Sequence, residues 1–287
     1  MITPADKTLP GDSSLPKPGI YLRQYSVRKK RRQIMSKSLL IRGRNIGQGA
    51  PKIVVPIVGK TKDGILSSAN RIHEMKADIV EWRVDWFSGG CDIASVKNVL
   101  PDLRDALGEI PLLFTFRTAK EGGETELPPD SYAELTKSAV STGLVDLVDV
   151  ELFTGEEYVK DILCSAHAHS VPVIASSHDF QKTPGKEEIL SRMKKMDALG
   201  ADILKIAVMP LGRADVITLL DATQEADASI DKPIVTMAMG RMGLISRLCG
   251  EAFGSALTFG SVGAASAPGQ INAEDLREIL ALIHANS

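Results

Sequence analysis

The sequence predicts a single α/β domain folded as a (β/α)₈ barrel, a TIM barrel, and three observations support this expectation. Short apolar runs alternate with longer amphipathic patterns along the chain after residue 36. Eight such runs fit into about 235 residues, which is the usual size of this barrel. A glycine-rich phosphate loop does not follow the first run, which disfavours the alternative of an open, doubly wound sheet.

The eight runs are rich in Val, Ile and Leu along their whole length. Nearly continuous apolar sequence is typical of parallel strands that are covered on both faces. Before the first run, residues 39–46 alternate loosely and lead into an Asn45-Ile46-Gly47 turn, so we expect a hairpin that plugs the barrel floor. We expect the strands at residues 53–58, 78–84, 112–117, 144–152, 171–176, 201–208, 233–239 and 256–262.

Amphipathic patterns with a helical period separate the later runs. The turn chemistry agrees, because Asp130 is suited to cap the first of these helices and Gly200 to end the third. The expected helices lie at residues 130–141, 156–168, 187–199, 214–226, 244–253 and 273–285.

Residues 1–36 differ from the rest of the chain in composition. Four prolines stand among Gly, Ser and Asp, and five consecutive cations follow at residues 28–32. Such a segment buries no core, so we expect a disordered basic N-terminal extension, with the barrel as the catalytic domain over residues 37–287. A basic run can bind RNA or an anionic membrane, but on a floppy tail it is more typical of a solvated extension.

The overall composition is that of an ordinary globular protein. Apolar residues make up 44% and charged residues 24%, and the formal net charge is −2, which is unlike a nucleic-acid binder. No apolar run approaches the roughly 20 residues that span a bilayer, and the N-terminus lacks a secretory core, so we expect a cytoplasmic protein with no membrane or nucleic-acid partner. Cys91, Cys164 and Cys249 share no metal-ligand spacing, which predicts buried free thiols in a reducing compartment and no metal site.

Charged side chains interrupt several runs that should be apolar. Glu81 and Arg83 stand two residues apart and share one strand face. Arg117 closes the third run, His178 follows the fifth, and Lys205 interrupts the sixth. A single charge of this kind is often paired inside the protein, as Glu81 could be with Arg83, or lies in a loop. Recurrence in four units, toward the carboxyl half of each strand, indicates an active site at the barrel mouth.

Lys205 is the most informative of these residues. An ordinary lysine, with a pKa near ~10.4, is almost wholly protonated at neutral pH, and only the neutral amine attacks a ketone. Burial among Ile203, Ile206 and Ala207, with an arginine nearby, would increase the neutral fraction. His178 could then act as a proton shuttle, because an ordinary histidine titrates near pH ~6.5.

At this point the residues resemble the type I 3-dehydroquinate dehydratases of the shikimate pathway. The resemblance covers about residues 39–283 and rests on motifs that occur in order along the chain. They are Glu-Trp-Arg-Val-Asp at 81–85, Leu-Phe-Thr-Phe-Arg-Thr-Ala-Lys-Glu-Gly-Gly at 113–123, Ser-His-Asp-Phe at 177–180, Gly-Ala-Asp-Ile-Leu-Lys-Ile-Ala at 200–207, Ile-Ser-Arg at 245–247 and Ala-Ser-Ala-Pro-Gly-Gln at 265–270.

The resemblance implies a lyase that needs no metal or cofactor, is usually a homodimer, and converts 3-dehydroquinate to 3-dehydroshikimate by syn loss of water. Lys205 would form an imine with the substrate, His178 would be the general acid and base, and Glu121 would orient and polarise His178. The other site residues would bind the substrate: Arg247 at its carboxylate, Glu81, Arg83 and Arg117 at its ring hydroxyls, Met239 and Phe259 as apolar walls, and Ser266 and Gln270 on a closing loop.

One departure from the family pattern stands in the first strand, where Pro56 replaces a serine that some members carry. A hydroxyl contact to the substrate is lost there. On the residues alone, two other functions remain open. A class I aldolase also uses a barrel lysine but would cleave a carbon–carbon bond. A docking module that used residues 28–32, with the barrel as a scaffold, would bind heparin in a salt-dependent way.

Overall fold

The structure is a computed structural model that describes residues 37–75, 77–263 and 266–287. The extension predicted for residues 1–36 lies outside the described residues, so its disorder stays a prediction. Within the part that is described, no helix is both long enough and apolar enough to cross a membrane.

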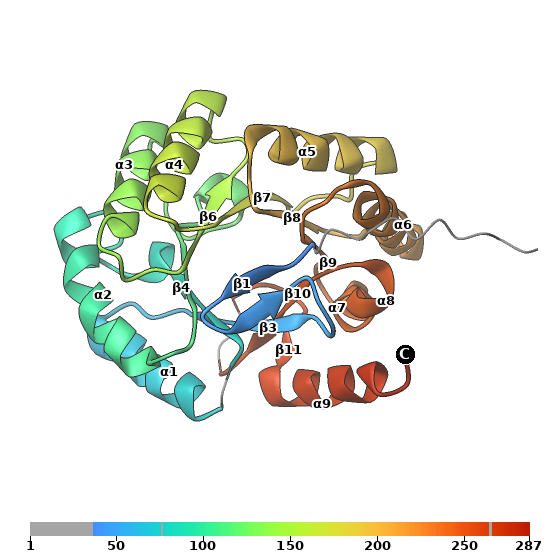
Figure 1. Ribbon diagram of the computed structural model, residues 1–287, viewed down its shortest axis with the longest axis horizontal. Helices are drawn as coiled ribbons and strands as arrows, with labels where there is room; N and C mark the ends of the chain where they lie inside the picture. Colours follow the sequence, from blue (N-terminus) through green and yellow to red (C-terminus); the bar gives the residue numbers. More distant parts are fainter. Residues whose placement is uncertain (1–36, 76, 264–265) are drawn as a thin grey trace, which may run out of the picture. The chain divides into compact units, whose positions relative to one another are not determined.

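The described residues form the predicted barrel, with its strands in the centre and helices around them (Figure 1). Neighbouring strands follow the chain order from β3 to β9 and pair in parallel, as successive β/α units require, and β10 pairs in parallel with β3. An isolated bridge between Ile234 and Ser255 connects the two ends of the ring. The strands are β3 (Lys52–Ile57), β4 (Ile79–Arg83), β5 (Leu112–Thr115), β6 (Leu147–Glu151), β7 (Val173–Asp179), β8 (Ile203–Val208), β9 (Ile234–Ala238) and β10 (Leu257–Ser261), and a short β11 (Ile271–Asn272) pairs outside β10.

The helices include two that the sequence patterns did not indicate, α1 and α2. Thr61 and Asp92 cap their N-termini, and Pro101 lies inside α2, where a proline ordinarily weakens a helical pattern. The helix predicted at residues 244–253 is divided at Cys249. The helices are α1 (Lys62–Glu74), α2 (Ile93–Leu107), α3 (Pro129–Val140), α4 (Glu156–Ala168), α5 (Lys186–Leu199), α6 (Arg213–Ser229), α7 (Leu244–Leu248), α8 (Gly250–Phe253) and α9 (Ala273–His284).

Two local expectations can be compared directly with helix ends. Gly200 ends α5 in the left-handed conformation, with φ of 94°, as predicted. The expectation for Asp130 was wrong, because α3 begins earlier, at Pro129, and Pro128 occupies the cap position. A proline suits the first helical position, since its missing N–H has no partner there in any helix.

The thiols are only partly as predicted. All three cysteines are free, but Cys91 and Cys164 are exposed and Cys249 is half-buried. Their expected burial was therefore wrong. Cys91 precedes α2 and Cys164 lies on α4, outside the barrel wall, so neither belongs to the apolar layer between strands and helices.

Alternation along each strand sorts the side chains into those that pack under the helices and those that fill the barrel. The inward side chains near the strand starts are apolar: Val54, Ile79, Leu113, Leu147, Ile174, Ile203 and Val235 belong to one buried cluster. Two residues further along, the same face carries Glu81, Thr115, Asp149, Ser176 and Lys205. The barrel interior therefore changes from apolar to polar toward the carboxyl ends of the strands.

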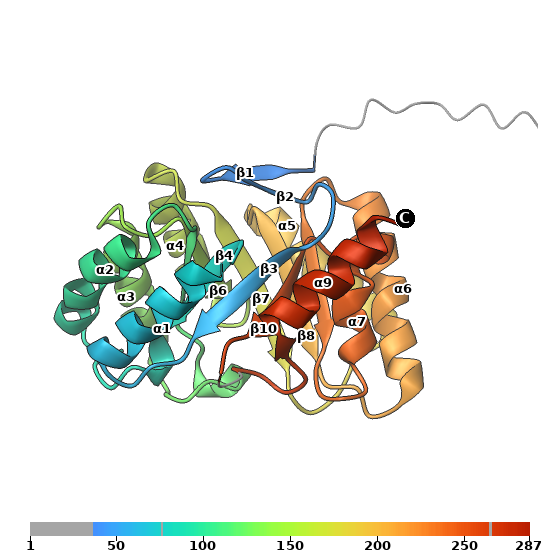
Figure 2. The same ribbon diagram turned by 90° about the horizontal axis from the view of Figure 1, so that it is seen from below.

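A hairpin precedes the barrel, formed by β1 (Leu39–Ile41) and β2 (Arg44–Ile46) in antiparallel pairing. Figure 2 shows it at the end of the barrel where β3 begins. Ile41 and Ile46 are buried in the same cluster as the apolar residues at the strand starts. The hairpin therefore covers the end where the strands begin, and the end where the strands finish is left for a site.

Candidate active site

A cavity opens at the carboxyl ends of the strands and encloses about 460 Å³, including its mouth. Nearly every residue expected at the site lines it, although the strands that carry these residues are far apart in the sequence. The lining includes Glu81, Arg83, Arg117, His178, Lys205, Met239, Arg247, Phe259, Ser266 and Gln270.

Lys205 lies in the middle of β8 and points into the barrel. Its side chain is only 4% exposed, and its Nζ donates a hydrogen bond of 3.0 Å to Oδ2 of Asp149. Oε1 of Glu81 lies 4.0 Å from the same Nζ, and the centroid of the Phe259 ring lies 4.6 Å away. The amine is thus held at the cavity wall between two carboxylates and an aromatic face.

His178, on β7, forms a close pair with Glu121, the partner that the family resemblance implies. Oε2 of Glu121 lies 2.8 Å from Nδ1 of His178 and also accepts the His178 backbone N–H at 2.9 Å. Oε2 accepts the backbone N–H of His178, so it serves as an acceptor at this position. When Nδ1 also donates to Oε2, Nε2 keeps its lone pair. Glu121 is presented by a short 3₁₀ turn, η2 (Ala119–Glu121), that follows β5.

Burial shifts the titration of both members of this pair. Burial, and then the positive charges of Arg117 and Lys205, hold the pKa of His178 well below its usual value. Burial also raises the pKa of Glu121 to about 8, although Arg117 acts in the opposite direction. At neutral pH the imidazole is therefore uncharged and able to accept a proton.

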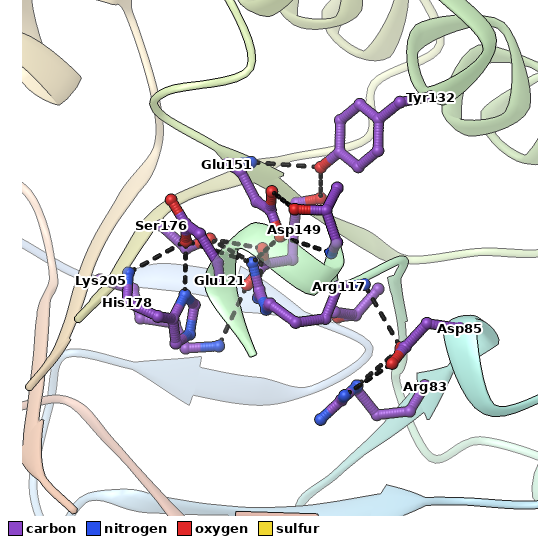
Figure 3. A network of polar contacts seen from close by, with 12 residues as sticks. Arg83, Asp85, Arg117, Glu121, Tyr132, Asp149, Glu151, Ser176, His178 and Lys205 are labelled. Carbon is purple, nitrogen blue, oxygen red and sulfur yellow. Dashed lines mark hydrogen bonds and ion pairs between the residues drawn. The ribbon is translucent and has the colours of Figure 1, made fainter. Parts of the chain in front are cut away.

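Arg117 connects the lysine and the histidine through carboxylates (Figure 3). Its guanidinium lies 2.7 Å from Asp149, 2.9 Å from Glu151 and 3.8 Å from Glu121. Burial opposes its charge, but Asp149 and Glu151 hold the pKa of Arg117 well above its usual value. Arg117 does line the cavity, as expected, yet most of its donors are directed at these carboxylates.

The remaining arginines differ in how they are paired. Arg83 forms a two-fold hydrogen bond with Asp85, at 2.8 and 2.7 Å, rather than the pair with Glu81 considered from the sequence. Arg247, on α7, is 1% exposed and among the described residues forms no ion pair with a carboxylate. Its Nε has no hydrogen-bond partner within the described part of the chain, and burial lowers its pKa to about 10, so it is still a cation at neutral pH. A buried guanidinium without a carboxylate partner is suited to bind a carboxylate of a ligand.

The loop before β11 closes one side of the cavity. Gln270 accepts the Ser266 backbone N–H at 2.9 Å and donates to the Ser266 hydroxyl at 3.0 Å. The backbone carbonyls of Ser266 and Pro268 accept hydrogen bonds from Arg83 and Arg247, at 3.3 and 3.2 Å. These contacts fasten the loop to two of the arginines that line the cavity.

Pro56 is buried on β3 and pairs in register with Glu81. It therefore lies in the same layer as Glu81 and Lys205, and a serine hydroxyl is missing from that layer. Within the described part of the chain, no group of three or more His, Cys, Asp or Glu side chains is arranged to hold a metal ion.

Sequence reasoning missed the anionic centre of the site, formed by Asp149 and Glu151 on β6. Both are buried, and both point inward because they stand two residues apart. The hydroxyl of Tyr132, on α3, accepts the Glu151 N–H at 3.1 Å and donates to the Asp149 carbonyl at 3.2 Å, which fixes this strand. Glu81 and Arg83 have the same two-residue spacing within an apolar run, so this pattern of charges could also have indicated Asp149 and Glu151 from the sequence.

Fold and site together define a class of protein, the TIM-barrel enzymes that gather reactive side chains from several strands at the barrel mouth. Comparison with known proteins gives the particular family. The sequence model of the family described as type I 3-dehydroquinase matches residues 53–287. The chain belongs to this family.

Relatives named 3-dehydroquinate dehydratase match this chain over nearly their whole length. The 3-dehydroquinate dehydratase of Clostridioides difficile is 51% identical over 87% of this chain and 98% of that protein. That of Salmonella typhimurium is 51% identical over 86% of this chain and 99% of that protein. A crystal structure of the type I enzyme from Clostridium difficile has a TM-score of 0.86 at 50% identity and covers 88% of this chain and 100% of that one.

Proposed function

We propose that this protein dehydrates 3-dehydroquinate to 3-dehydroshikimate through an imine on Lys205. The observation that carries the proposal is a buried lysine in one cavity with a histidine and with a buried arginine that has no carboxylate partner among the described residues. The crystal structure of the Clostridium difficile relative is described with covalent modified comenic acid, and covalent chemistry in that relative is compatible with the proposal.

The lysine supplies the electron sink that the reaction needs. The neutral Nζ attacks the ketone carbon, the carbonyl oxygen leaves as water, and a protonated imine remains. Nε2 of His178 then removes the adjacent C2 proton, and the electrons of that C–H bond enter the imine to give an enamine. The enamine expels the C1 hydroxyl, which takes a proton from His178 and leaves as a second water. Addition of one water hydrolyses the imine and frees the lysine, so the net change is loss of one water.

The other side chains would bind and orient the substrate. Arg247 would bind the substrate carboxylate with its planar guanidinium. The carboxylate would then neutralise the charge of this buried cation. Glu81, Arg83 and Arg117 would meet the ring hydroxyls, and Glu121 would orient and polarise His178. Met239 and Phe259 would serve as apolar walls, and Ser266 and Gln270 as part of the closing loop.

Two substitutions separate the roles of the lysine and the histidine. Lys205→Ala is expected to abolish turnover and covalent capture of the substrate together. His178→Ala is expected to lower kcat by about 10²–10⁴-fold, the usual contribution of general acid–base catalysis, while the imine still forms. Stopped-flow absorbance of the enone product and mass spectrometry of the borohydride-treated protein measure the two effects. Equal, mild losses in both variants would contradict the proposal.

The homodimer that the family resemblance implies, and the cytoplasmic location expected from the sequence, stay predictions. A sedimentation-equilibrium mass equal to twice the chain mass would support the dimer. A mass equal to one chain, at concentrations where the enzyme is active, would contradict it.

A further inference from the structure

Asp149 is the anion in closest contact with Lys205, and the mechanism above gives it no task. Its side chain is fully buried, and both of its oxygens are hydrogen-bonded. Oδ2 accepts Lys205 Nζ at 3.0 Å, while Oδ1 accepts Arg117 at 2.7 Å and the Ser176 hydroxyl at 2.6 Å. Figure 3 shows the carboxylate at the meeting point of these groups.

The protonation state of Asp149 follows from these contacts. Burial alone would raise its pKa, but Arg117 and Lys205 together hold the pKa of Asp149 well below its usual range. The carboxylate is therefore negative at neutral pH. It is too weak a base to keep the lysine proton, so its effect on Lys205 is electrostatic and geometric.

The charge on Nζ changes during the proposed reaction. It is positive in the ammonium, neutral in the attacking amine and positive again in the protonated imine. A fixed anion at 3.0 Å stabilises the first and third of these states relative to the second. It also directs Nζ to one place in the cavity wall.

We infer that Asp149 is a positioning residue that serves as the counter-ion of Lys205 in both its ammonium and its imine form. The inference rests on the imine mechanism proposed above and adds a residue to it. Arg117 and Ser176 fix the carboxylate from the other side, so it can move little when the imine replaces the ammonium.

The other charged groups around Lys205 do not duplicate this contact. Glu81, on β4, lies at 4.0 Å and accepts the Thr115 hydroxyl. Arg117, after β5, adds positive charge, His178, on β7, is uncharged at neutral pH, and β10 contributes the Phe259 ring. Without Asp149, the two cations Lys205 and Arg117 would lose the anion that lies between them.

Loss of the Asp149 charge should change the pH dependence of imine formation. Asp149→Asn removes an anion beside the ammonium, so the neutral amine forms at a lower pH. An opposite charge at this distance shifts a titration by about 1–3 pH units. The pH midpoint for capture of 3-dehydroquinate by cyanoborohydride, read by intact-protein mass, is expected to move down by about that amount. The protonated imine also loses its counter-ion, and kcat is expected to fall by at least about tenfold.

Asp146→Asn is the matched control. Asp146 immediately precedes β6 and forms ion pairs with Arg104, at 2.7 Å, and Arg42, at 2.5 Å, toward the amino ends of the strands. The substitution removes a carboxylate that pairs with an arginine, as Asp149 does, but it leaves the cavity lining unchanged. We expect lower thermal stability in this variant and an unchanged capture midpoint.

A second variant keeps the test decisive if Asp149→Asn does not fold. Asp149→Glu retains the charge but displaces it by one methylene, so we expect a capture midpoint near that of the wild type with a reduced kcat. An unchanged midpoint in folded Asp149→Asn, or a wild-type kcat in Asp149→Glu, would overturn the inference. Absence of capture in the wild type would instead contradict the imine mechanism, so the two failures are distinguishable.

Discussion

At the scale of single residues, His178 and Glu121 behave as one titrating pair. They share a contact of 2.8 Å, and the pKa of Glu121 is raised to about 8 by burial. Above that pH the carboxylate is an anion and stabilises the imidazolium that forms when His178 takes the C2 proton. Below it the carboxyl is neutral, and this stabilisation is weaker.

The pair therefore predicts the direction of the pH dependence of turnover. In the wild type, kcat should fall as the pH decreases through about 8. Glu121→Gln should show the low-pH rate throughout, because an amide does not titrate, and the transition near pH 8 should vanish. Steady-state kcat measured across the pH range, at saturating 3-dehydroquinate, checks this. A transition retained in the variant would show that another group titrates there.

The same residues show why sequence reasoning found part of the site. Lys205 and His178 stood out because a charged or titratable side chain interrupts or directly follows an apolar strand. Arg247 was assigned only through the family resemblance, since it lies on the short helix α7. Which carboxylate meets which cation could not be read from the sequence, because Arg117 and Asp149 come from neighbouring strands whose stagger fixes the contact.

At the scale of elements, the turn after β5 determines where Glu121 lies. Gly122 ends η2 with φ of +83°, a conformation that favours glycine, and a Cβ there would come within 2.2 Å of the Phe180 ring. The turn, the ring and the glycine therefore fit together tightly. Phe180 follows His178 by two residues, so a shift of the ring disturbs both members of the pair.

Gly122→Ala is expected to lower the free energy of unfolding by about 1–3 kcal/mol, from backbone strain and overpacking. It should also reduce kcat, because Glu121 moves away from His178. Gly143→Ala is the control, since Gly143 has φ of +70° but open space where the Cβ would be. Urea unfolding and kcat are measured for both. An equal loss of stability in the two variants, with kcat unchanged, would show that the contact with Phe180 is unimportant.

Element prediction succeeded for strands better than for helices. All eight predicted strands are found within the described residues, because buried parallel strands have an unambiguous apolar signature. The helices α1 and α2 lacked such a signature, since Gly64 and two serines dilute the first and Pro101 interrupts the second. Packing against the barrel stabilises them despite these residues.

At the scale of the whole molecule, the layering of the barrel interior explains why chemistry is confined to one end. The floor is apolar and excludes water, while the next layers hold ionised groups that neutralise one another. The number and order of the strands could be predicted from the sequence, because right-handed crossovers leave few alternatives. The charge balance of the interior could not, because it depends on contacts between several strands at once.

The central claim is that Lys205 bonds covalently to the substrate, and reductive capture tests it most directly. Borohydride reduction in the presence of 3-dehydroquinate, followed by proteolysis and peptide mass mapping, should give one adduct, on the peptide that contains Lys205. Loss of activity should parallel its formation. An enzyme that turns over normally but yields no adduct, or an adduct on a different lysine, would contradict the account.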